Sequence, residues 1–156
     1  MKRPLPTVTT LPKEDPAAIR FPRWKRPVFE ANGMTEWGWM CQHPERLKLG
    51  KYVDIGAFSY INAEYGVEIG ELAQVGSHSS IYSVSTIDNK KGRVVIKRNA
   101  RIGSHSVVMP GVTIGENAII GAFSFVKSDV PDNALAYGIP ARVVRKHEPE
   151  RNRRRA

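Results

Sequence analysis

Residues 102–122 read IGSHSVVMPGVTIGENAIIGA, and in this stretch a bulky aliphatic residue returns at every sixth position. The positions are Ile102, Val108, Ile114 and Ile120. A period of six fits neither an amphipathic helix, whose apolar residues recur about every 3.6 positions, nor a simple alternating strand. It is typical of short strands joined by tight corners, where each corner turns the chain so that the next aliphatic residue points into the same interior.

The same spacing continues on both sides of this stretch. Further aliphatic residues in step are Leu49, Ile55, Ile61, Ile69, Val75, Ile81, Ile87, Ile96 and Val126. Except at Tyr65, a small or β-branched residue returns four positions after the aliphatics: Val53, Ser59, Ala73, Ser79, Ser85, Ala100, Ser106, Val112, Ala118 and Ser124. Three positions after an aliphatic residue come Asn99, Gly111 and Asn117, which are residues that tolerate the positive φ of a corner. An internal repeat of this kind predicts a solenoid of stacked parallel coils.

Two insertions break the period. The step from Ile61 to Ile69 is two residues longer than six, and the step from Ile87 to Ile96 is three residues longer. Insertions in a solenoid leave as loops on one face, and such loops commonly line a binding site. Residues 88–93 are therefore the first place where we expect substrate contacts, although the same Asp-Asn-Lys-Lys-Gly composition also suits a plain surface turn.

The repeat predicts an all-β chain in three parts. They are an N-terminal arm and cap over residues 1–46, a β-helix over 47–130, and a closing segment with a basic tail over 131–156. We expect Trp24, Trp37 and Trp39 to cover apolar surface that the first coil would otherwise expose. An aromatic platform for an acceptor is the alternative.

Length and composition restrict the class of protein. A chain of 156 residues has room for one domain, and we find neither a signal sequence nor the roughly 18 apolar residues of a membrane helix. We predict a cytoplasmic protein, because the lone Cys41 fits a reducing compartment. The net charge of +9 suggests nucleic acid, a membrane surface or a phosphorylated cofactor. Much of that charge lies in terminal clusters, which are usually solvated tails, so we expect no nucleic acid and no membrane partner.

The stretch 102–122 and the closing run AYGIPARVVR at residues 136–145 resemble the hexapeptide-repeat acetyltransferases, notably the galactoside, maltose and xenobiotic acetyltransferases. The likeness covers about residues 47–146. It implies a left-handed parallel β-helix, a homotrimer with active sites in the grooves between subunits, and acetyl-CoA as the acyl donor. The handedness comes only from this resemblance, because parallel crossovers are otherwise nearly always right-handed.

The resemblance also implies a donor site. The family's CoA contacts fall on Ser104, Ala122, Lys127, Arg142 and Arg145. Fixed cations suit the phosphates of CoA, and small residues let its pantetheine arm approach the backbone. For the two arginines, surface salt bridges that clamp the tail are the alternative.

Acceptor residues follow in the same way. Asn62 matches an acceptor-binding Asn of the sugar acetyltransferases, and an amide can both donate to and accept from a hydroxyl. The alternative is that this amide satisfies the turn backbone. Glu64 would project from the same corner, and we add Ser85 and Thr86 to the acceptor site.

The chain departs from the family at the catalytic base. The family's histidine falls on Thr86, which cannot take a proton near neutral pH. Either another residue serves, or the acceptor is an amine that mainly needs positioning. We predict His78 as the base, with His105 second and Asp88 third. The alternative for both histidines is structural, because they occupy corner positions where positive φ is common.

Together these residues predict acetyl transfer from acetyl-CoA to a sugar or amino sugar, possibly nucleotide-linked, with no metal. The missing family histidine slightly favours an amine. Two other classes stay open. One is a non-catalytic β-helix scaffold. The other is a γ-type carbonic anhydrase, which needs three histidines around zinc with one closely spaced pair, and His78 and His105 offer no such pair.

Overall fold

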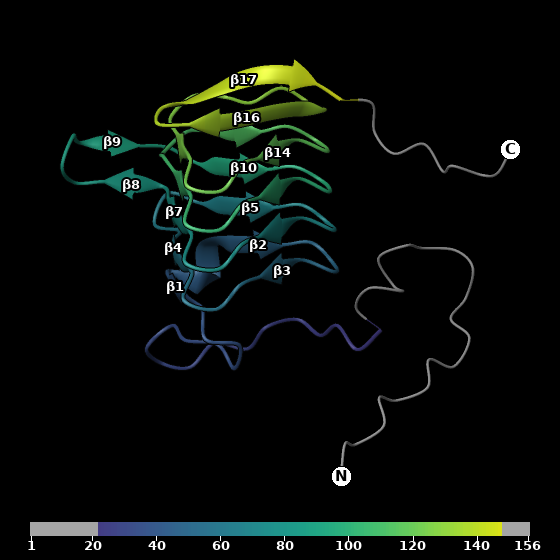
Figure 1. The fold of residues 1–156 in the computed structure, drawn as a ribbon. Coiled ribbons are helices and arrows are strands. Elements are labelled where there is room, and N and C mark those ends of the chain that lie inside the picture. The colour runs from purple at the N-terminus through teal and green to yellow at the C-terminus, as the bar shows by residue number, and fades with distance from the viewer. Residues whose placement is uncertain (1–21, 148–156) are drawn as a thin grey trace, which may run out of the picture.

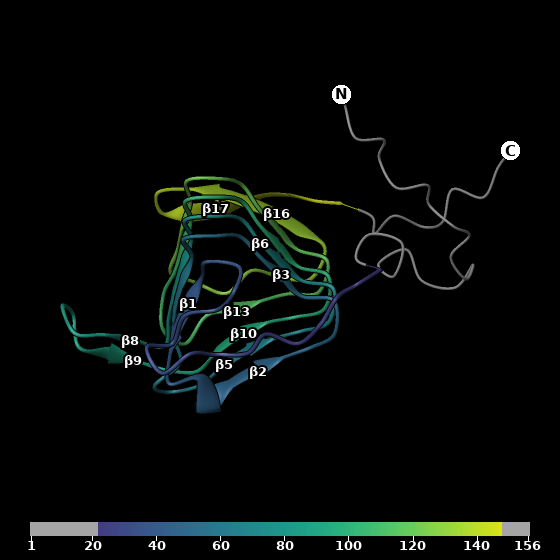
Figure 2. The same ribbon diagram turned by 90° about the horizontal axis from the view of Figure 1, so that it is seen from below.

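A computed structural model describes residues 22–147, which form a three-sided prism of stacked coils (Figure 1). Seen along the coil axis, the three sides are three sheets, parallel except for the last strand of the chain, that meet at three corners (Figure 2). Apart from one 3-10 turn, η1 (Pro44–Arg46), the regular elements of this part of the chain are all strands. This all-β solenoid confirms the predicted left-handed β-helix.

Each sheet collects one strand from each coil. Sheet 1 contains β1 (Met40–Gln42), β4 (Tyr60–Asn62), β7 (Ser80–Tyr82), β12 (Val107–Val108) and β15 (Phe125–Val126). Sheet 2 contains β2 (Leu47–Leu49), β5 (Val67–Ile69), β10 (Val94–Ile96) and β13 (Thr113–Ile114). Sheet 3 contains β3 (Asp54–Ile55), β6 (Gln74–Val75), β11 (Arg101–Ile102), β14 (Ile119–Ile120), β16 (Ala134–Gly138) and β17 (Ala141–Lys146). Below, corner 1–2 is where the chain passes from sheet 1 to sheet 2, and corners 2–3 and 3–1 are named likewise.

The aliphatic residues of the six-residue period fill the interior. Ile61 and Ile81 pair across β4 and β7, and both are at most 1% exposed. Ile96 and Ile114 pair in the same way in sheet 2 and are fully buried. Their sequence neighbours face outward because side chains alternate along a strand. The interior columns predicted from the sequence are therefore confirmed.

The corners show the backbone that the repeat predicts. Asn99 and Asn117 have φ of 56°, and Gly111 has φ of 80°. At corner 2–3 the side chains form a ladder, in which Asn99 Nδ2 donates to Asn117 Oδ1 (2.8 Å) and Asn117 Nδ2 donates to Asn133 Oδ1 (3.1 Å). At corner 3–1 a Cβ on Gly103 would lie 2.4 Å from the backbone nitrogen of Ala122, so the close approach of two coils requires glycine there.

The prediction that Ile87 and Ser85 continue the interior pattern is wrong. Ile87 is 99% exposed, at the end of a hairpin made by β8 (Val84–Ser85) and β9 (Lys90–Lys91), which projects from corner 1–2 (Figure 1). Ser83 takes the interior position instead, and Val94 resumes the coil; both are fully buried. The inserted residues pair with each other as an antiparallel hairpin, so they satisfy their own backbone outside the prism.

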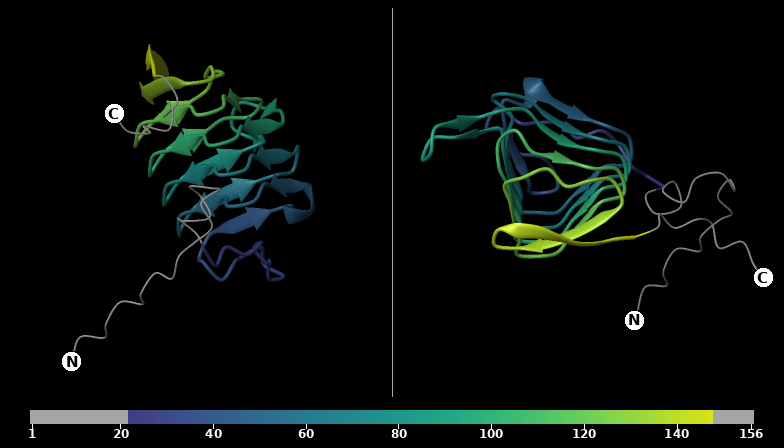
Figure 3. Two further views of the ribbon diagram at one scale, coloured as in Figure 1. Left: turned by 90° about the vertical axis from the view of Figure 1, so that its right-hand side faces the viewer. Right: turned by 90° about the horizontal axis from the view of Figure 1, so that it is seen from above.

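The ladder of coils extends further than the predicted boundaries at residues 47 and 130. β1 pairs in parallel with β4, so sheet 1 begins at Met40. At the other end β16 pairs in parallel with β14, and β17 folds back on it to close the prism (Figure 3). Beneath the first coil, Trp39 is 3% exposed and packs edge-on against Phe29. The predicted arm before residue 22 and the Arg-rich tail after residue 147 lie outside the described residues.

Candidate functional site

Corner 1–2 carries the irregular parts of the repeat. In the first coil it is occupied by η1, in the next by the turn at residues 63–66, and in the third by the β8–β9 hairpin. The coil above passes from Val108 to Val112 with no insertion. Extra residues therefore gather on one edge of the prism, as expected for a binding face.

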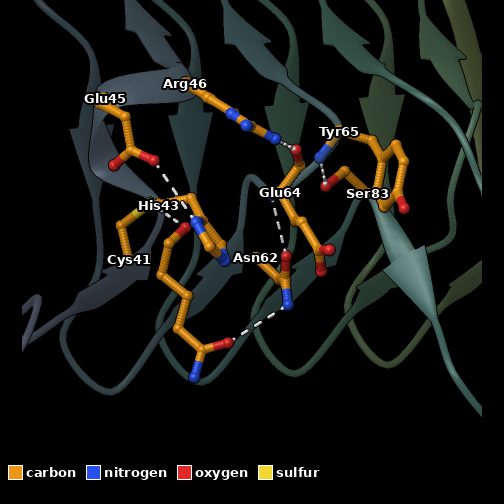
Figure 4. Close-up of polar contacts among 9 residues, drawn as sticks. Cys41, His43, Glu45, Arg46, Asn62, Glu64, Tyr65 and Ser83 are labelled. Carbon is orange, nitrogen blue, oxygen red and sulfur yellow. Dashed lines mark hydrogen bonds and ion pairs between the residues drawn. The ribbon is translucent and has the colours of Figure 1, made fainter.

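The outer surface of this corner holds a network of polar side chains (Figure 4). Gln42 Oε1 accepts hydrogen bonds from Tyr60 OH (2.7 Å) and from Asn62 Nδ2 (3.3 Å). Asn62 Oδ1 accepts from the Glu64 backbone N–H (3.0 Å), so this amide does satisfy the turn backbone. The NH₂ group of Asn62 lies on the outer surface, where a hydroxyl could compete for it.

Glu64 adds a carboxylate beside this network. Its backbone oxygen accepts a hydrogen bond from Arg46, while its carboxylate forms no ion pair within residues 22–147. The next residue, Tyr65, donates its backbone N–H to Ser83 Oγ (2.9 Å). A cleft of about 460 Å³ opens at this corner and is lined by Glu45, Arg46, Lys48, Glu64 and Arg93, among others. Because carboxylate side chains and basic side chains both line the cleft, it suits a polar ligand.

The hairpin places the other predicted acceptor residues on a projecting arm. Ser85 pairs with Lys90 across the hairpin, and Thr86 is exposed near its end. Asp88 lies 3.1 Å from Lys90 Nζ. Hydrogen bonds from Ser85 and then from Lys90 lower the pKa of Asp88. A carboxylate held ionised in this way is a weak proton acceptor, so these contacts argue against Asp88 as the base.

His78 and His105 lie at corner 3–1, away from Asn62. Their rings stack at 4.7 Å with 10° between the planes, and Phe58 and Phe123 extend the stack on either side at 4.9 and 4.8 Å. Both histidines have φ of 59°, as the structural alternative predicts for these corner positions. Within residues 22–147 no carboxylate pairs with either ring.

The predicted CoA residues fall mainly on this second corner. Ser104 and Ala122 occupy equivalent positions in successive coils of corner 3–1. Arg142 pairs with Tyr137 on the terminal hairpin close to this corner, and Arg145 lies further along β17 opposite Leu135. Lys127 is apart from them, because it follows β15 at corner 1–2.

Both arginines are exposed, and neither forms an ion pair with another described residue. The salt-bridge alternative is therefore not seen within residues 22–147. Arg142 lies close to corner 3–1 and Arg145 further along β17, so both cations are available to the phosphates of an extended ligand.

The two corners are separated by the whole of sheet 1. The strands of sheet 1, such as β4 (Tyr60–Asn62), run from corner 3–1 to corner 1–2, so the two sets of residues lie at opposite edges of that sheet. The donor set at corner 3–1 and the acceptor set at corner 1–2 are consequently not in contact within one chain.

Other features of the described part of the chain give no competing centre. No group of three His, Cys, Asp or Glu side chains in residues 22–147 could hold a metal ion. In the same range no helix has the length and apolarity to cross a membrane. Burial, with a smaller effect from Glu45, raises the pKa of the Cys41 thiol to about 12, so it stays protonated. A cavity of about 590 Å³ lies against Trp24, Trp37 and Trp39, the residues of the aromatic-platform alternative, and no residue predicted for the CoA site or for the acceptor site at corner 1–2 lines it.

Sequence reasoning missed the first strand of sheet 1 and its contribution to the site. Gln42 is in register with Asn62, and Asn62 with Tyr82. Each step is twenty residues, so the spacing was available as a signal. This spacing could not be recognised from the aliphatic pattern, because the strand Met40-Cys41-Gln42 has Cys41 at its interior position in place of a bulky aliphatic residue.

Comparisons with known proteins agree with this architecture. The family model described as bacterial transferase hexapeptide (six repeats) matches residues 93–128. The galactoside O-acetyltransferase of Escherichia coli K12 is 33% identical over 133 residues, which cover 76% of this chain and 64% of that protein. The dTDP-3-amino-3,6-dideoxy-alpha-D-galactopyranose 3-N-acetyltransferase of Aneurinibacillus thermoaerophilus is 54% identical over 52 residues, or 33% of this chain and 27% of that protein. The chain thus spans less than two thirds of the length of these curated relatives.

Among solved structures, a hexapeptide-repeat-containing acetyltransferase of Vibrio cholerae O1 biovar eltor, complexed with acetyl-coenzyme A, superposes with a TM-score of 0.67. It is 26% identical, and the match covers 71% of this chain and 66% of that one. In sequence and in fold the chain is similar to the hexapeptide-repeat acetyltransferases, which confirms the resemblance predicted from its repeat.

Proposed function

We propose that the protein transfers an acetyl group from acetyl-CoA to a hydroxyl or amine of a sugar-like acceptor. The observation that carries this proposal is the pair of exposed arginines on β17, which form no ion pair within residues 22–147, together with the small residues Ser104 and Ala122 at corner 3–1. Arg142 and Arg145 supply cations, and Ser104 and Ala122 leave the backbone of corner 3–1 accessible. This arrangement fits a long ligand with phosphates at one end and a slender arm.

Acetyl-CoA supplies the activated acetyl group as a thioester. In the proposed complex its phosphates bind Arg142 and Arg145, its arm follows Ser104 and Ala122, and Lys127 contacts it from a neighbouring copy. The solved Vibrio cholerae relative, which is complexed with acetyl-coenzyme A, supports this donor.

The acceptor binds at corner 1–2 in the proposed complex. Asn62 and Glu64 provide an amide and a carboxylate for hydroxyl or amine groups, and Ser85 and Thr86 contact the acceptor from the hairpin. The names of the two curated relatives, one a galactoside and the other a dTDP-linked amino-sugar enzyme, support a sugar or amino sugar, including a nucleotide-linked one.

Two copies of the chain build each site in this proposal. Donor and acceptor residues lie on opposite edges of sheet 1, so the acetyl group on one copy meets an acceptor on the next. A homotrimer with threefold symmetry closes this arrangement with three equivalent sites. His78 and His105 then border the groove from the donor side. A cytoplasmic location, suggested by the single free cysteine, completes the proposal.

The test is acetyl transfer by the purified full chain. Thiol release from acetyl-CoA is measured over a panel of hydroxyl sugars, amino sugars and nucleotide-linked amino sugars, with calorimetry for CoA binding. The proposal expects saturable turnover with at least one sugar class. No turnover together with no CoA binding would contradict it and favour the scaffold alternative.

A further inference from the structure

We propose that His43, whose Nδ1 lies beside the Glu45 carboxylate, takes the proton from the acceptor during acetyl transfer. This inference rests on the proposed function and assigns its missing base. It moves the base from corner 3–1 and the hairpin, where sequence reasoning placed it, to the first coil of corner 1–2.

The position of His43 follows from strand register. Gln42 pairs with Asn62, so the next residue, His43, enters corner 1–2 one coil below Ala63. The Gln42 and Asn62 side chains are themselves linked at 3.3 Å. Figure 4 shows the imidazole on the outer surface of this corner, with Asn62 and Glu64 on the same side. His43 therefore lies where the acceptor residues gather.

The immediate surroundings of the ring suit a proton acceptor. Nδ1 lies 3.4 Å from Glu45 Oε1, and the side chain is 45% exposed. No residue in the range 22–147 hydrogen-bonds to Nε2. A carboxylate beside Nδ1 favours the tautomer with its proton on that nitrogen and leaves the lone pair of Nε2 directed at a substrate.

The backbone fixes the two partners in one short turn. His43 has φ of 59° and ψ of 53° and caps η1, and its carbonyl accepts the Arg46 N–H at 2.9 Å. Glu45 is in that same turn, so it moves with the imidazole.

The charged groups around His43 are Glu45, Glu64 and Arg46 on the outside, while the Cys41 thiol points into the coil. His78 and His105 have no carboxylate partner among residues 22–147 and lie in an aromatic stack. Asp88 is held ionised by Ser85 and Lys90. His43 is the histidine that combines an orienting carboxylate with a place beside the acceptor residues.

The proposed step is balanced as follows. The acceptor oxygen or nitrogen attacks the thioester carbonyl carbon, and Nε2 of His43 takes its proton as the new C–O or C–N bond forms. The C–S bond then breaks, and the departing CoA sulfur receives the proton from the imidazolium. The products are the acetylated acceptor and CoA thiol.

The experiment replaces His43 by glycine in the full chain and supplies free imidazole. Glycine tolerates the positive φ at this position, so the substitution removes the ring while it leaves the backbone path allowed. Leu72→Gly is the matched control, because Leu72 has φ of 66° at corner 2–3 and belongs to neither site. We measure kcat, KM, acetyl-CoA affinity and the pH profile of kcat/KM for both.

For His43→Gly we expect kcat to fall by about 10² to 10⁴, the range of general base catalysis, with acetyl-CoA affinity within twofold. Imidazole should restore at least about a tenth of the lost rate, and the acid limb of the pH profile should vanish without it. Glu45→Gln should lower kcat by about tenfold through loss of ring orientation. A purely structural role of His43 would give no rescue by imidazole.

Three outcomes overturn the inference. If the wild type transfers acetyl and His43→Gly has an unchanged kcat, His43 is not the base, while the proposed function stands. If kcat falls further in His78→Gly than in His43→Gly, His78 is the residue that takes the proton. No transfer by the wild type to any acceptor overturns the proposed function, and this inference with it.

Discussion

Corner 3–1 and corner 1–2 are built from one repeat, yet they differ in regularity. At corner 3–1 each of four coils places a residue with φ near 60° at the same position, and the rings of Phe58, His78, His105 and Phe123 stack in line. At corner 1–2 the coils differ in length, and η1, a turn and a hairpin replace one another. Regular coils place equivalent side chains in line, whereas coils of different length bring different polar side chains together.

This difference matches the two halves of the proposed reaction. A long and uniform donor arm suits a straight corner of small residues, such as Ser104 and Ala122. A compact acceptor needs polar groups from several directions, and corner 1–2 supplies them from β1, β4 and the hairpin.

The largest expected effect is on stability at the regular corner. A Cβ on Gly103 would meet the Ala122 backbone at 2.4 Å, whereas a Cβ on Gly111 at corner 1–2 meets nothing within 4 Å. We expect Gly103→Ala to cost about 3 kcal/mol of unfolding free energy through overpacking. Gly111→Ala should cost only about 1 kcal/mol, for its positive φ. Urea unfolding of both variants measures the difference, and equal costs would contradict the account of the corners.

The second effect is on donor affinity. Arg142→Ala combined with Arg145→Ala should weaken CoA binding by about 30-fold, roughly 2 kcal/mol, because two charge-assisted contacts are lost. Calorimetry measures the affinity, and light scattering checks that the proposed homotrimer forms as in the wild type. Arg98→Ala combined with Arg101→Ala is the control, since it removes the same charge elsewhere on the outer surface. Equal losses in the two double variants would refute the assignment.

A smaller effect is expected at corner 2–3, the other regular corner. Asn117→Gly keeps the positive φ and removes both ladder hydrogen bonds. We expect a loss of about 1 kcal/mol in unfolding free energy, since these bonds are partly exposed. Turnover at saturating substrates should stay at the wild-type value, and a fall in kcat would show that this corner takes part in the reaction.

The smallest effect on stability is expected from the hairpin. Replacing residues 85–90 by Asn-Gly joins Val84 to Lys91 through a two-residue turn, which the pairing of those two residues permits. We expect unfolding free energy to change by no more than about 0.5 kcal/mol, because the removed residues pack little. Acceptor kcat/KM should fall while CoA affinity stays constant. Unchanged kinetics would remove Ser85 and Thr86 from the acceptor site.

Much of the fold could be predicted because a six-residue period constrains every coil. Ile102, Ile114 and Ile120 were placed in the interior from spacing alone, and they are at most 3% exposed. Ile87 was misplaced because an aliphatic residue in step within an insertion looks the same as one in a coil. Only the pairing of Val84 with Lys91 reveals the hairpin.

The candidate site was harder to predict than the fold. Asn62 is predicted from the resemblance and Glu64 from its place in the same corner, whereas Gln42 and His43 precede the first aliphatic residue of the repeat. Their place beside Asn62 depends on strand register, which the spacing shows only after β1 is recognised. The separation of donor and acceptor residues by sheet 1 also needs coordinates, because neighbours in sequence occupy different corners.

In the proposed function each site is shared between two copies of the chain, and a mixture of two defective variants tests this sharing. One variant carries Asn62→Ala and Glu64→Ala, the other Arg142→Ala and Arg145→Ala, and the two are unfolded and refolded together in equal amounts. Random assembly into a threefold ring would make about a quarter of the grooves intact, so about a quarter of wild-type kcat/KM should return. Activity equal to the average of the two separate variants would contradict the claim.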